Sequence, residues 1–200
     1  KVCWFMLNAQ NPIGFTVSDD LKYKIAKLLH QYHIHLIEDD VYEELYSGLN
    51  KPLPMKYFDS NNLVLHCSSF SKTLGAGFRV GWVYAGKYSE QIQHLQLMST
   101  ISANTLIQNA LVEFVSSHHY EKHLRQLRRR LEKNKKRFTQ YLKQHLGQCC
   151  EIYSFSGGYF IWIKLPLYLN SLELYHQLIT QQIGVAPSAL FNVLENNQHA

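Results

Sequence analysis

Apolar and polar residues form blocks along the first 85 residues, and these blocks predict strands separated by a helix and by loops. Val2–Leu7 is an uninterrupted apolar run of six residues, which is typical of a buried strand. Ser18 is a suitable N-cap for a helix of about four turns, with acidic residues in its first turn. Three further strands are expected at residues 33–38, 63–67 and 80–85. The apolar positions of the helix are Leu21, Ile25, Leu28 and Leu29.

This order of strand, helix, strand, loop and two more strands predicts an α/β fold with a largely parallel sheet. In such sheets the residues that bind ligands follow the carboxyl ends of the strands. Polar residues stand at those positions in this chain, so we expect the functional site at that end of the sheet.

Helical periodicity dominates the next part of the chain, over residues 92–98, 105–115 and a long basic segment that ends near Leu146. Beyond Gly147 we expect a smaller α+β unit. Its strands are predicted at residues 151–155, at 159–165 and near Val185, and its helix from Ser171 to about Gln181. The chain is therefore divided into residues 1–120, a long connecting helix at 121–147 and a smaller C-terminal part at 148–200.

The composition is that of a folded protein, because 46% of the residues are hydrophobic and only 18% are charged. The apolar run at residues 2–7 is far shorter than the ~20 residues of a membrane-spanning helix, and no signal peptide is recognisable. We expect a cytoplasmic protein without contact to a membrane. The four cysteines and eleven histidines lack the spacing of zinc ligands, so reduced thiols and no metal are expected. Since the chain opens with Lys1 directly before a strand, we expect a fragment of a larger protein.

The net charge of +5 comes from a single segment. Between Glu121 and Lys143 there are ten Lys or Arg and two Asp or Glu, a local net charge of +8, so the rest of the chain carries −3. Apolar residues recur in this segment at mostly three-, four- and seven-residue steps, which predicts a helix with one apolar stripe and basic residues on its other faces. A solvated helix face and a surface that contacts phosphates both fit this pattern. The stripe comprises Leu124, Leu127, Leu131, Phe138, Leu142 and Leu146.

Three polar segments carry candidate chemistry, and the first contains a lysine. Ser69, Ser71 and Lys72 follow a predicted strand, and Arg79 ends the glycine-rich turn after them. The amine of a lysine in such a turn can form a Schiff base with an aldehyde cofactor. Hydroxyls, backbone amides and a guanidinium around it suit a phosphate dianion. An aldehyde that carries a phosphate points to pyridoxal 5′-phosphate.

The other two segments offer hydrogen-bonding groups to the ring of the same cofactor. Asp39 and Asp40 end the strand at residues 33–38, and a carboxylate there would keep a pyridine nitrogen protonated. Tyr42, just beyond, has a phenol that could bond the ring's phenolic oxygen, and the amide of Asn11 could donate to the same oxygen. Taken alone, each segment is also typical of a solvated strand end or turn.

In this order, the three segments together resemble the fold-type I pyridoxal-phosphate enzymes, specifically the class I and II aminotransferases. The resemblance extends over essentially the whole chain, and Gly157–Trp162 looks like the start of the family's small domain. It implies that residues 1–120 are part of a large cofactor-binding domain and residues 148–200 part of the small domain.

The resemblance also implies a role for each candidate residue. Lys72 would form the Schiff base with the cofactor and later move the α-proton of a substrate. Asp39 would pair with the pyridine nitrogen, with Asp40 as the competing choice, and the family spacing D-x-x-Y favours Asp39 because it lies three residues before Tyr42. The ring oxygen would be bound by Tyr42 and Asn11, and the phosphate by Ser69, Ser71 and Arg79.

A narrower resemblance concerns the strings EDDVYEEL and LHCSSFSK, which look like the effector domain of MocR-type transcription regulators in the GntR family. Those proteins join an N-terminal winged helix-turn-helix to an aminotransferase-like domain. The resemblance implies an amino-acid or amine ligand, a homodimer in the full-length protein and DNA binding through a domain outside this chain. It also implies that an aromatic ring stacking on the cofactor would precede Lys1 and that a substrate-binding arginine would follow Ala200.

Three functions remain open at this point. The first is a ligand-sensing regulatory domain that binds pyridoxal phosphate. The second is a free-standing aminotransferase that transfers amino groups between an amino acid and a 2-oxo acid. The third is a nucleic-acid-binding module built on the basic helix around residues 128–137, whose affinity for random duplex DNA would fall steeply with salt.

Overall fold

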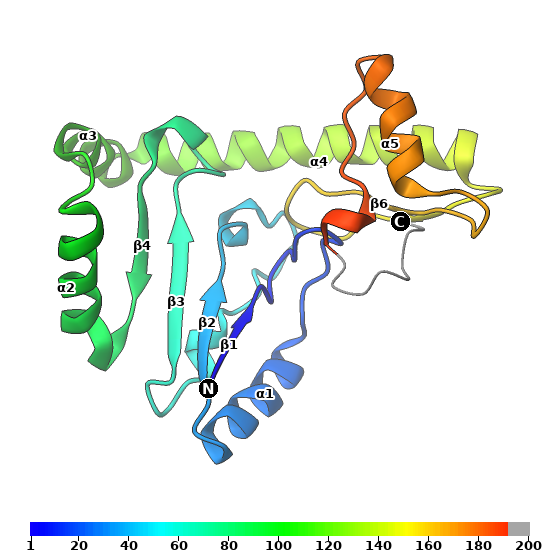
Figure 1. Cartoon of the computed structure of the whole chain (residues 1–200). Helices are drawn as coiled ribbons and strands as arrows, with labels where there is room; N and C mark the ends of the chain where they lie inside the picture. Colours follow the sequence, from blue (N-terminus) through cyan, green and yellow to red (C-terminus); the bar gives the residue numbers. More distant parts are fainter. Residues whose placement is uncertain (192–200) are drawn as a thin grey trace.

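The fold is organised around a four-stranded sheet in the order β1-β2-β3-β4 (Figure 1). The computed structural model describes residues 1–191. Three strands are parallel, namely β1 (Val2–Phe5), β2 (His35–Asp39) and β3 (Val64–Ser69), and β4 (Gly81–Tyr84) runs antiparallel to β3. The α/β class with a largely parallel sheet is therefore confirmed.

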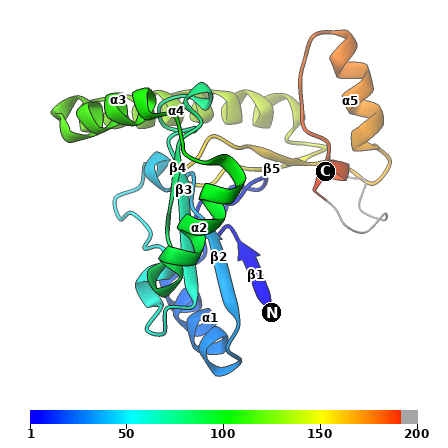
Figure 2. The same ribbon diagram turned by 60° about the vertical axis from the view of Figure 1, so that its left-hand side comes forward.

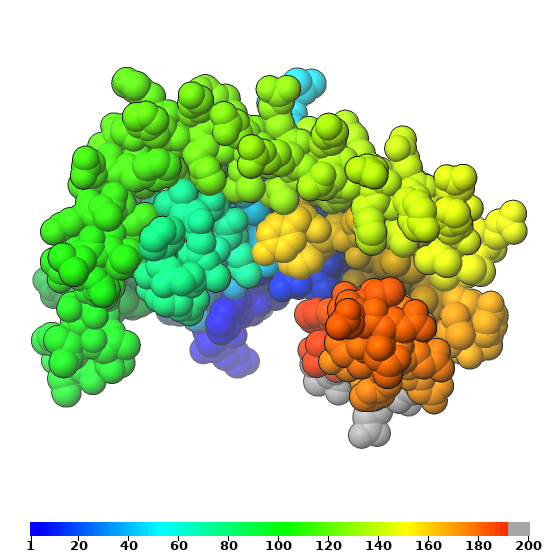
Figure 3. Space-filling model, turned by 90° about the horizontal axis from the view of Figure 1, so that it is seen from above, coloured from blue at the N-terminus to red at the C-terminus, as the bar shows by residue number. Residues whose placement is uncertain are grey.

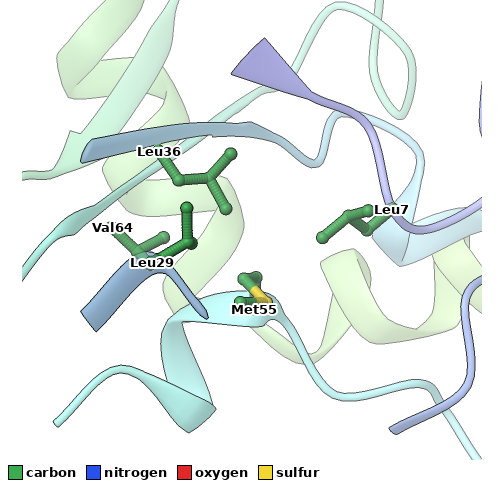
Figure 4. Packing of buried hydrophobic residues seen from close by; sticks show 5 residues of the cluster. All are labelled: Leu7, Leu29, Leu36, Met55 and Val64. Carbon is green, nitrogen blue, oxygen red and sulfur yellow. The ribbon is translucent and has the colours of Figure 1, made fainter. Parts of the chain in front are cut away.

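Helix α1 (Asp19–Gln31) packs beside this sheet and begins where the sequence predicts. The hydroxyl of Ser18 accepts a hydrogen bond from the backbone N–H of Leu21 at 3.4 Å, as expected of an N-cap. Leu29 joins a buried cluster with residues of β2, β3 and the 3₁₀ turn at Met55–Phe58 (Figure 4). The labelled members of this cluster are Leu7, Leu29, Leu36, Met55 and Val64.

The inward face of α1 differs from the prediction at three positions. Leu21 and Leu28 are exposed, whereas the side chain of Lys22 is completely buried. Lys22 is accommodated because its ammonium donates hydrogen bonds to the Asn8 side chain at 2.7 Å and to the carbonyl of Leu53 at 2.6 Å. A buried charge of this kind requires partners from other segments, which hydrophobic periodicity does not report.

Strand β1 is not the buried strand that its apolar run predicts. Val2 is 62% exposed and Trp4 is 69% exposed. The reason is its position, because β1 is the edge of the sheet and has only β2 as a strand neighbour among residues 1–191. At the opposite edge, all four residues of β4 are exposed as well.

Three helices follow the sheet: α2 (Ser89–Thr100), α3 (Thr105–Ser116) and α4 (His118–Leu146). Helix α4 runs across the end of the sheet to which the arrowheads of β1, β2 and β3 point (Figures 1 and 2). It is therefore the element that covers the carboxyl ends of the parallel strands. No helix in the described part of the chain is long and apolar enough to span a bilayer.

The remaining residues form a second, two-stranded antiparallel sheet with one helix. Strands β5 (Glu151–Tyr153) and β6 (Trp162–Lys164) are shorter than predicted, and α5 (Ser171–Thr180) agrees with the prediction. The strand expected near Val185 is wrong, since no strand forms there within residues 1–191. Pro187, two residues further on, has no N–H to donate to a ladder.

Candidate functional site

The register of the sheet separates the two candidate aspartates. Side chains alternate between the faces of a strand, and Asp39 therefore shares a face with Ile37, which lies opposite Trp4 on β1. On the other face, Glu38 is fully buried. Asp39 is the last residue of β2 and pairs with Cys67 of β3, so its carboxylate lies at the carboxyl end of two adjacent parallel strands.

The carboxylate of Asp39 has an unused hydrogen-bonding position. Its Oδ1 atom is buried and accepts no hydrogen bond from any residue in the described range 1–191. Burial raises the pKa of Asp39, while the Val41 amide, the Trp4 indole and the charge of Lys72 oppose this shift. A buried acceptor without a donor costs free energy, so this oxygen suits an N–H donor supplied by a ligand.

Tyr42 and Lys72 lie together beside this carboxylate. Tyr42 is 2% exposed, and the Lys72 ammonium lies 5.6 Å from the centre of its ring. Tyr159 and Phe160 contact the same ring edge-on, with centroids at 5.5 and 5.1 Å. Burial and the hydrogen bond with Tyr159 raise the pKa of Tyr42, so its phenol stays protonated and can donate.

The loop after β3 holds four of the predicted residues in one short segment. The carbonyl of Phe70 accepts hydrogen bonds from three successive amides, those of residues 73, 74 and 75, at 3.3, 2.9 and 3.2 Å. The Phe70 N–H donates to the carbonyl of Val80 at 3.1 Å, which closes the loop. Gly81 faces Ser69 across the ladder, and a Cβ at Gly81 would lie 2.9 Å from the carbonyl oxygen of Ser68. Ser69, Ser71, Lys72 and Arg79 all belong to this loop or border it.

Arg79 has a left-handed backbone, with φ of 52°. Such a conformation is uncommon for a residue other than glycine. Its side chain is exposed, and its guanidinium donates to the carbonyl of Ala76 at 3.4 Å. The guanidinium therefore lies along the loop and remains accessible to an anion.

Asn11 comes to the same end of the sheet through a tight turn. The amide of Gly14 donates to the carbonyl of Gln10, and the amide of Asn11 donates to the sulfur of Met6 at 3.1 Å. Met6 in turn packs against the buried cluster that contains Tyr42. These contacts fix the backbone of Asn11 near Tyr42. The side chain of Asn11 is exposed, so its carboxamide is available to a ligand.

Asp40 lies deeper in the interior than the half-buried Asp39. It is 1% exposed, and its Oδ2 atom accepts a hydrogen bond from the Asn8 amide at 3.1 Å, while its Oδ1 atom, like that of Asp39, has no partner among residues 1–191. Asn8 also accepts from the buried ammonium of Lys22. Burial together with the charges of Glu38 and Glu43 raises the pKa of Asp40 to about 7. This arrangement favours Asp39 over Asp40 as the carboxylate that faces a ligand.

Glu38, Asp40 and His66 place one donor atom each within 4.8 Å of one another. Glu38 is already bound on both oxygens, by the amides of Met55 at 2.5 Å and Lys56 at 3.1 Å and by the His66 ring at 2.8 Å. Burial lowers the pKa of His66, but the bond with Glu38 and the charges of Asp40 and Glu43 outweigh it and raise this pKa. The cluster is therefore a hydrogen-bonded ionic network that supports β2 and β3.

Two residues near the site were not predicted from the sequence. The indole of Trp4 donates a hydrogen bond to the Asp39 carboxylate. Tyr159, which follows the long helix in the sequence, is hydrogen-bonded to Tyr42. Trp4 was visible as part of a strand, but its pairing with Ile37 depends on the sheet register. Tyr159 directly follows two buried glycines with positive φ, Gly157 and Gly158, and a glycine pair was the available signal.

Comparisons with known proteins agree with this geometry. The family described as "Aminotransferase class I and II" matches residues 3–197. The HTH-type transcriptional regulator YdcR of Escherichia coli is 49% identical over 196 residues, which are 98% of this chain and 42% of the relative. YjiR, an HTH-type transcriptional regulator of the same organism, is 33% identical over 92% of this chain and 39% of its own length.

Solved structures show the same fold over the whole chain. A kynurenine aminotransferase from Pyrococcus horikoshii has a TM-score of 0.92 and 24% identity, and a multiple substrate aminotransferase from Thermococcus profundus has a TM-score of 0.92 and 23% identity. Each match covers 100% of this chain and 50% of the solved chain. This chain thus spans about half the length of the solved aminotransferases and about two fifths of the curated relatives.

Proposed function

The chain belongs to the class I and II aminotransferase family, and on that premise we propose that it binds pyridoxal 5′-phosphate as the effector-sensing domain of a MocR-type regulator in the GntR family. The observation that supports this cofactor is that Asp39, Tyr42 and Lys72 lie close together at the carboxyl ends of β2 and β3. The regulatory role is supported by the relatives, which are HTH-type transcriptional regulators. The ligand of such a domain would be an amino acid or an amine.

The residues present fit this cofactor. The unpaired Oδ1 of Asp39 would accept the N–H of a protonated pyridine ring. The protonated phenol of Tyr42 and the amide of Asn11 would donate to the ring oxygen. Ser69, Ser71 and Arg79 border the loop in which a phosphate would be held.

Each residue has a defined task in this proposal. When bound, pyridoxal phosphate supplies an aldehyde for amines and a ring that accepts electrons. Asp39 would keep the ring nitrogen protonated, because its buried Oδ1 atom is free to accept the N–H of that nitrogen. Lys72 supplies the amine that anchors the aldehyde and can carry a proton to and from the α-carbon of a ligand.

The test uses the full-length gene product purified with pyridoxal phosphate. We expect an absorption band in the visible or near ultraviolet that disappears on borohydride reduction, and peptide mapping should locate the reduced adduct on Lys72. Lys72→Ala should remove the band and keep the circular dichroism spectrum, with Lys87→Ala as an exposed control. An adduct on another lysine would contradict the site assignment.

A second candidate function is a free-standing aminotransferase, which is the activity that the names of the solved proteins with this fold give. A winged helix of ~70 residues upstream of the cofactor domain would support the regulator. Addition of an amino acid together with an excess of a different 2-oxo acid, which accepts the amino group and regenerates the aldehyde, distinguishes the two further. A regulator should change its absorption spectrum without sustained release of 2-oxo acid, whereas an aminotransferase should release it through many turnovers.

A further inference from the structure

Helix α4 has two different faces along its 29 residues. Leu124 and Leu142 are buried, and Leu127 and Leu131 pack against the cluster of Tyr42. On a helix with 3.6 residues per turn, a second set of residues lies on the opposite side. We call this set the outer stripe: Gln126, Arg129, Arg130, Lys133, Lys136, Arg137 and Gln140, which line one open surface together with Glu132.

Neighbouring acids neutralise the outer stripe very little. The ion pairs of α4 within the described residues are Arg128 with Glu44 at 2.9 Å and Lys136 with Glu132 at 2.7 Å. Arg128 lies outside the outer stripe, so Lys136 is its only member with an acidic partner among residues 1–191. Like charges one turn apart destabilise a helix. The repulsion between these cations therefore destabilises α4 in the free protein, and a polyanionic partner would relieve it.

The shape of the outer stripe suits a regular line of phosphates. The outer stripe runs from Gln126 to Gln140, which is about 21 Å of helix, and presents one or two side chains per ~5.4 Å turn. This length is rather more than half of the roughly 34–36 Å of one turn of B-DNA. Arginine forks bind phosphate oxygens in pairs, and glutamine amides also donate to them.

An acidic protein partner fits the outer stripe less well. Stable protein interfaces contain a central cluster of aromatic or aliphatic side chains. The residues that line this surface from Gln126 to Gln140 are all polar or charged. Figure 3 shows α4, in green to yellow, as a row of protruding side chains along one rim of the molecule, where a long partner could lie against it.

We propose that the outer stripe of α4 contacts the phosphate backbone of duplex DNA. The contact is independent of base sequence and belongs to this domain itself. It therefore goes beyond the proposed function, in which a separate winged-helix domain binds DNA. The inference does not depend on cofactor binding, so its failure would leave the proposed function intact.

The experiment measures binding of the 200-residue chain to a random 30-base-pair duplex by fluorescence anisotropy, between 50 and 200 mM NaCl. The test variant replaces Arg129, Arg130, Lys133 and Arg137 by Gln. The matched control replaces four exposed lysines that lie outside α4 by Gln and has the same net charge as the test variant. These lysines are Lys1, Lys24, Lys27 and Lys87. Each neutralised phosphate contributes about 0.9 to the slope of log K against log salt, so the loss of four charges should lower the slope by about 3.6 and the affinity at 50 mM by at least about tenfold.

The control variant should stay within about threefold of the unchanged chain. A further variant combines Arg129→Lys, Arg130→Lys and Arg137→Lys. It keeps the charge of the outer stripe and should keep the salt slope, which separates an effect of lost charge from an effect of lost fold. Equal losses in the test and control variants would overturn the proposal, as would no measurable binding by the unchanged chain at 50 mM. Binding of poly-L-glutamate as tight as that of the duplex would assign the surface to an acidic protein instead.

Discussion

At the scale of single residues, Asp39 and Asp40 are neighbours in the chain with different partners. Each has one buried carboxylate oxygen without a partner among residues 1–191, but Asp39 is half-buried and lies near the charge of Lys72, whereas Asp40 is buried and bonded to Asn8 in the interior. We predict that Asp39→Asn leaves the cofactor bound in the full-length protein but slows any transamination by about 100-fold or more, because an amide does not keep the ring nitrogen protonated. Asp40→Asn should change the rate far less. Single-turnover absorbance measurements compare the two, and the reverse ranking would place the site on Asp40.

The raised pKa of Asp40 gives a second residue-scale prediction. The folded chain keeps the Asp40 proton up to about pH 7, whereas the unfolded chain releases it near its ordinary pKa of 3.8. The folded state thus binds more protons in this window, so the free energy of unfolding should fall as pH rises from about 4 to 7, by up to about 1.4 kcal/mol per pH unit. The pKa of His66 is also raised in the folded state. Its contribution to the free energy of unfolding is fully present below its ordinary pKa of 6.5 and is lost as pH rises through the raised pKa of the folded state.

Asp40→Asn should flatten the fall in stability between pH 4 and 7, because the amide does not ionise. Urea unfolding at pH 4.5, 5.5, 6.5 and 7.5 measures this, with exposed Asp20→Asn as the control. An unchanged pH dependence in Asp40→Asn would show that Asp40 does not hold the proton.

At the scale of elements, α4 contacts segments beside the site residues. The His123 ring bonds the carbonyl of Thr73, next to Lys72, at 2.7 Å. Arg128 bonds the carbonyl and carboxylate of Glu44, two residues beyond Tyr42, at 2.6 and 2.9 Å. The helix therefore helps to fix the two loops that carry the candidate chemistry.

We predict that Arg128→Ala lowers the free energy of unfolding by about 1–2 kcal/mol, because two hydrogen bonds from a partly buried charge are lost. Arg125→Ala, three residues earlier on an exposed position, should change it by less than about 0.5 kcal/mol. Urea titrations of both variants provide the measurement. Similar values for the two would indicate that the contact with Glu44 contributes nothing to stability.

At the scale of the whole molecule, the 200-residue chain has two open sheet edges. β1 and β4 each have one strand neighbour within residues 1–191, and Trp4 and Tyr84 on them are exposed. Open edges and exposed apolar side chains favour association. The solved aminotransferases are about twice as long as this chain, so part of their structure has no counterpart in it.

We therefore predict that the isolated 200-residue chain associates and binds pyridoxal phosphate weakly, while the full-length gene product binds it well. Sedimentation velocity and cofactor titrations on both proteins test this. A monomeric chain that takes up one cofactor per molecule on Lys72 would show that the remaining contacts suffice to offset the cost of immobilising the ligand.

Local patterns in the sequence were enough to predict the order of the elements and the candidate residues. The Ser18 cap, the two long helices near residues 105–146 and the strands predicted at residues 33–38 and 63–67 depend on neighbours within a few positions. The structure confirms these elements, with the two strands extended to Asp39 and Ser69. Burial depends on distant segments, and there the prediction failed, since Val2, Trp4 and Phe5 are exposed at an edge and Lys22 is buried among partners from other segments. The orientation of Asp39 toward Trp4 and Lys72 rests on strand register, and the contact of Tyr42 with Tyr159 joins segments more than 100 residues apart. Such contacts are decided only when the chain packs, because they depend on the positions of many residues at once.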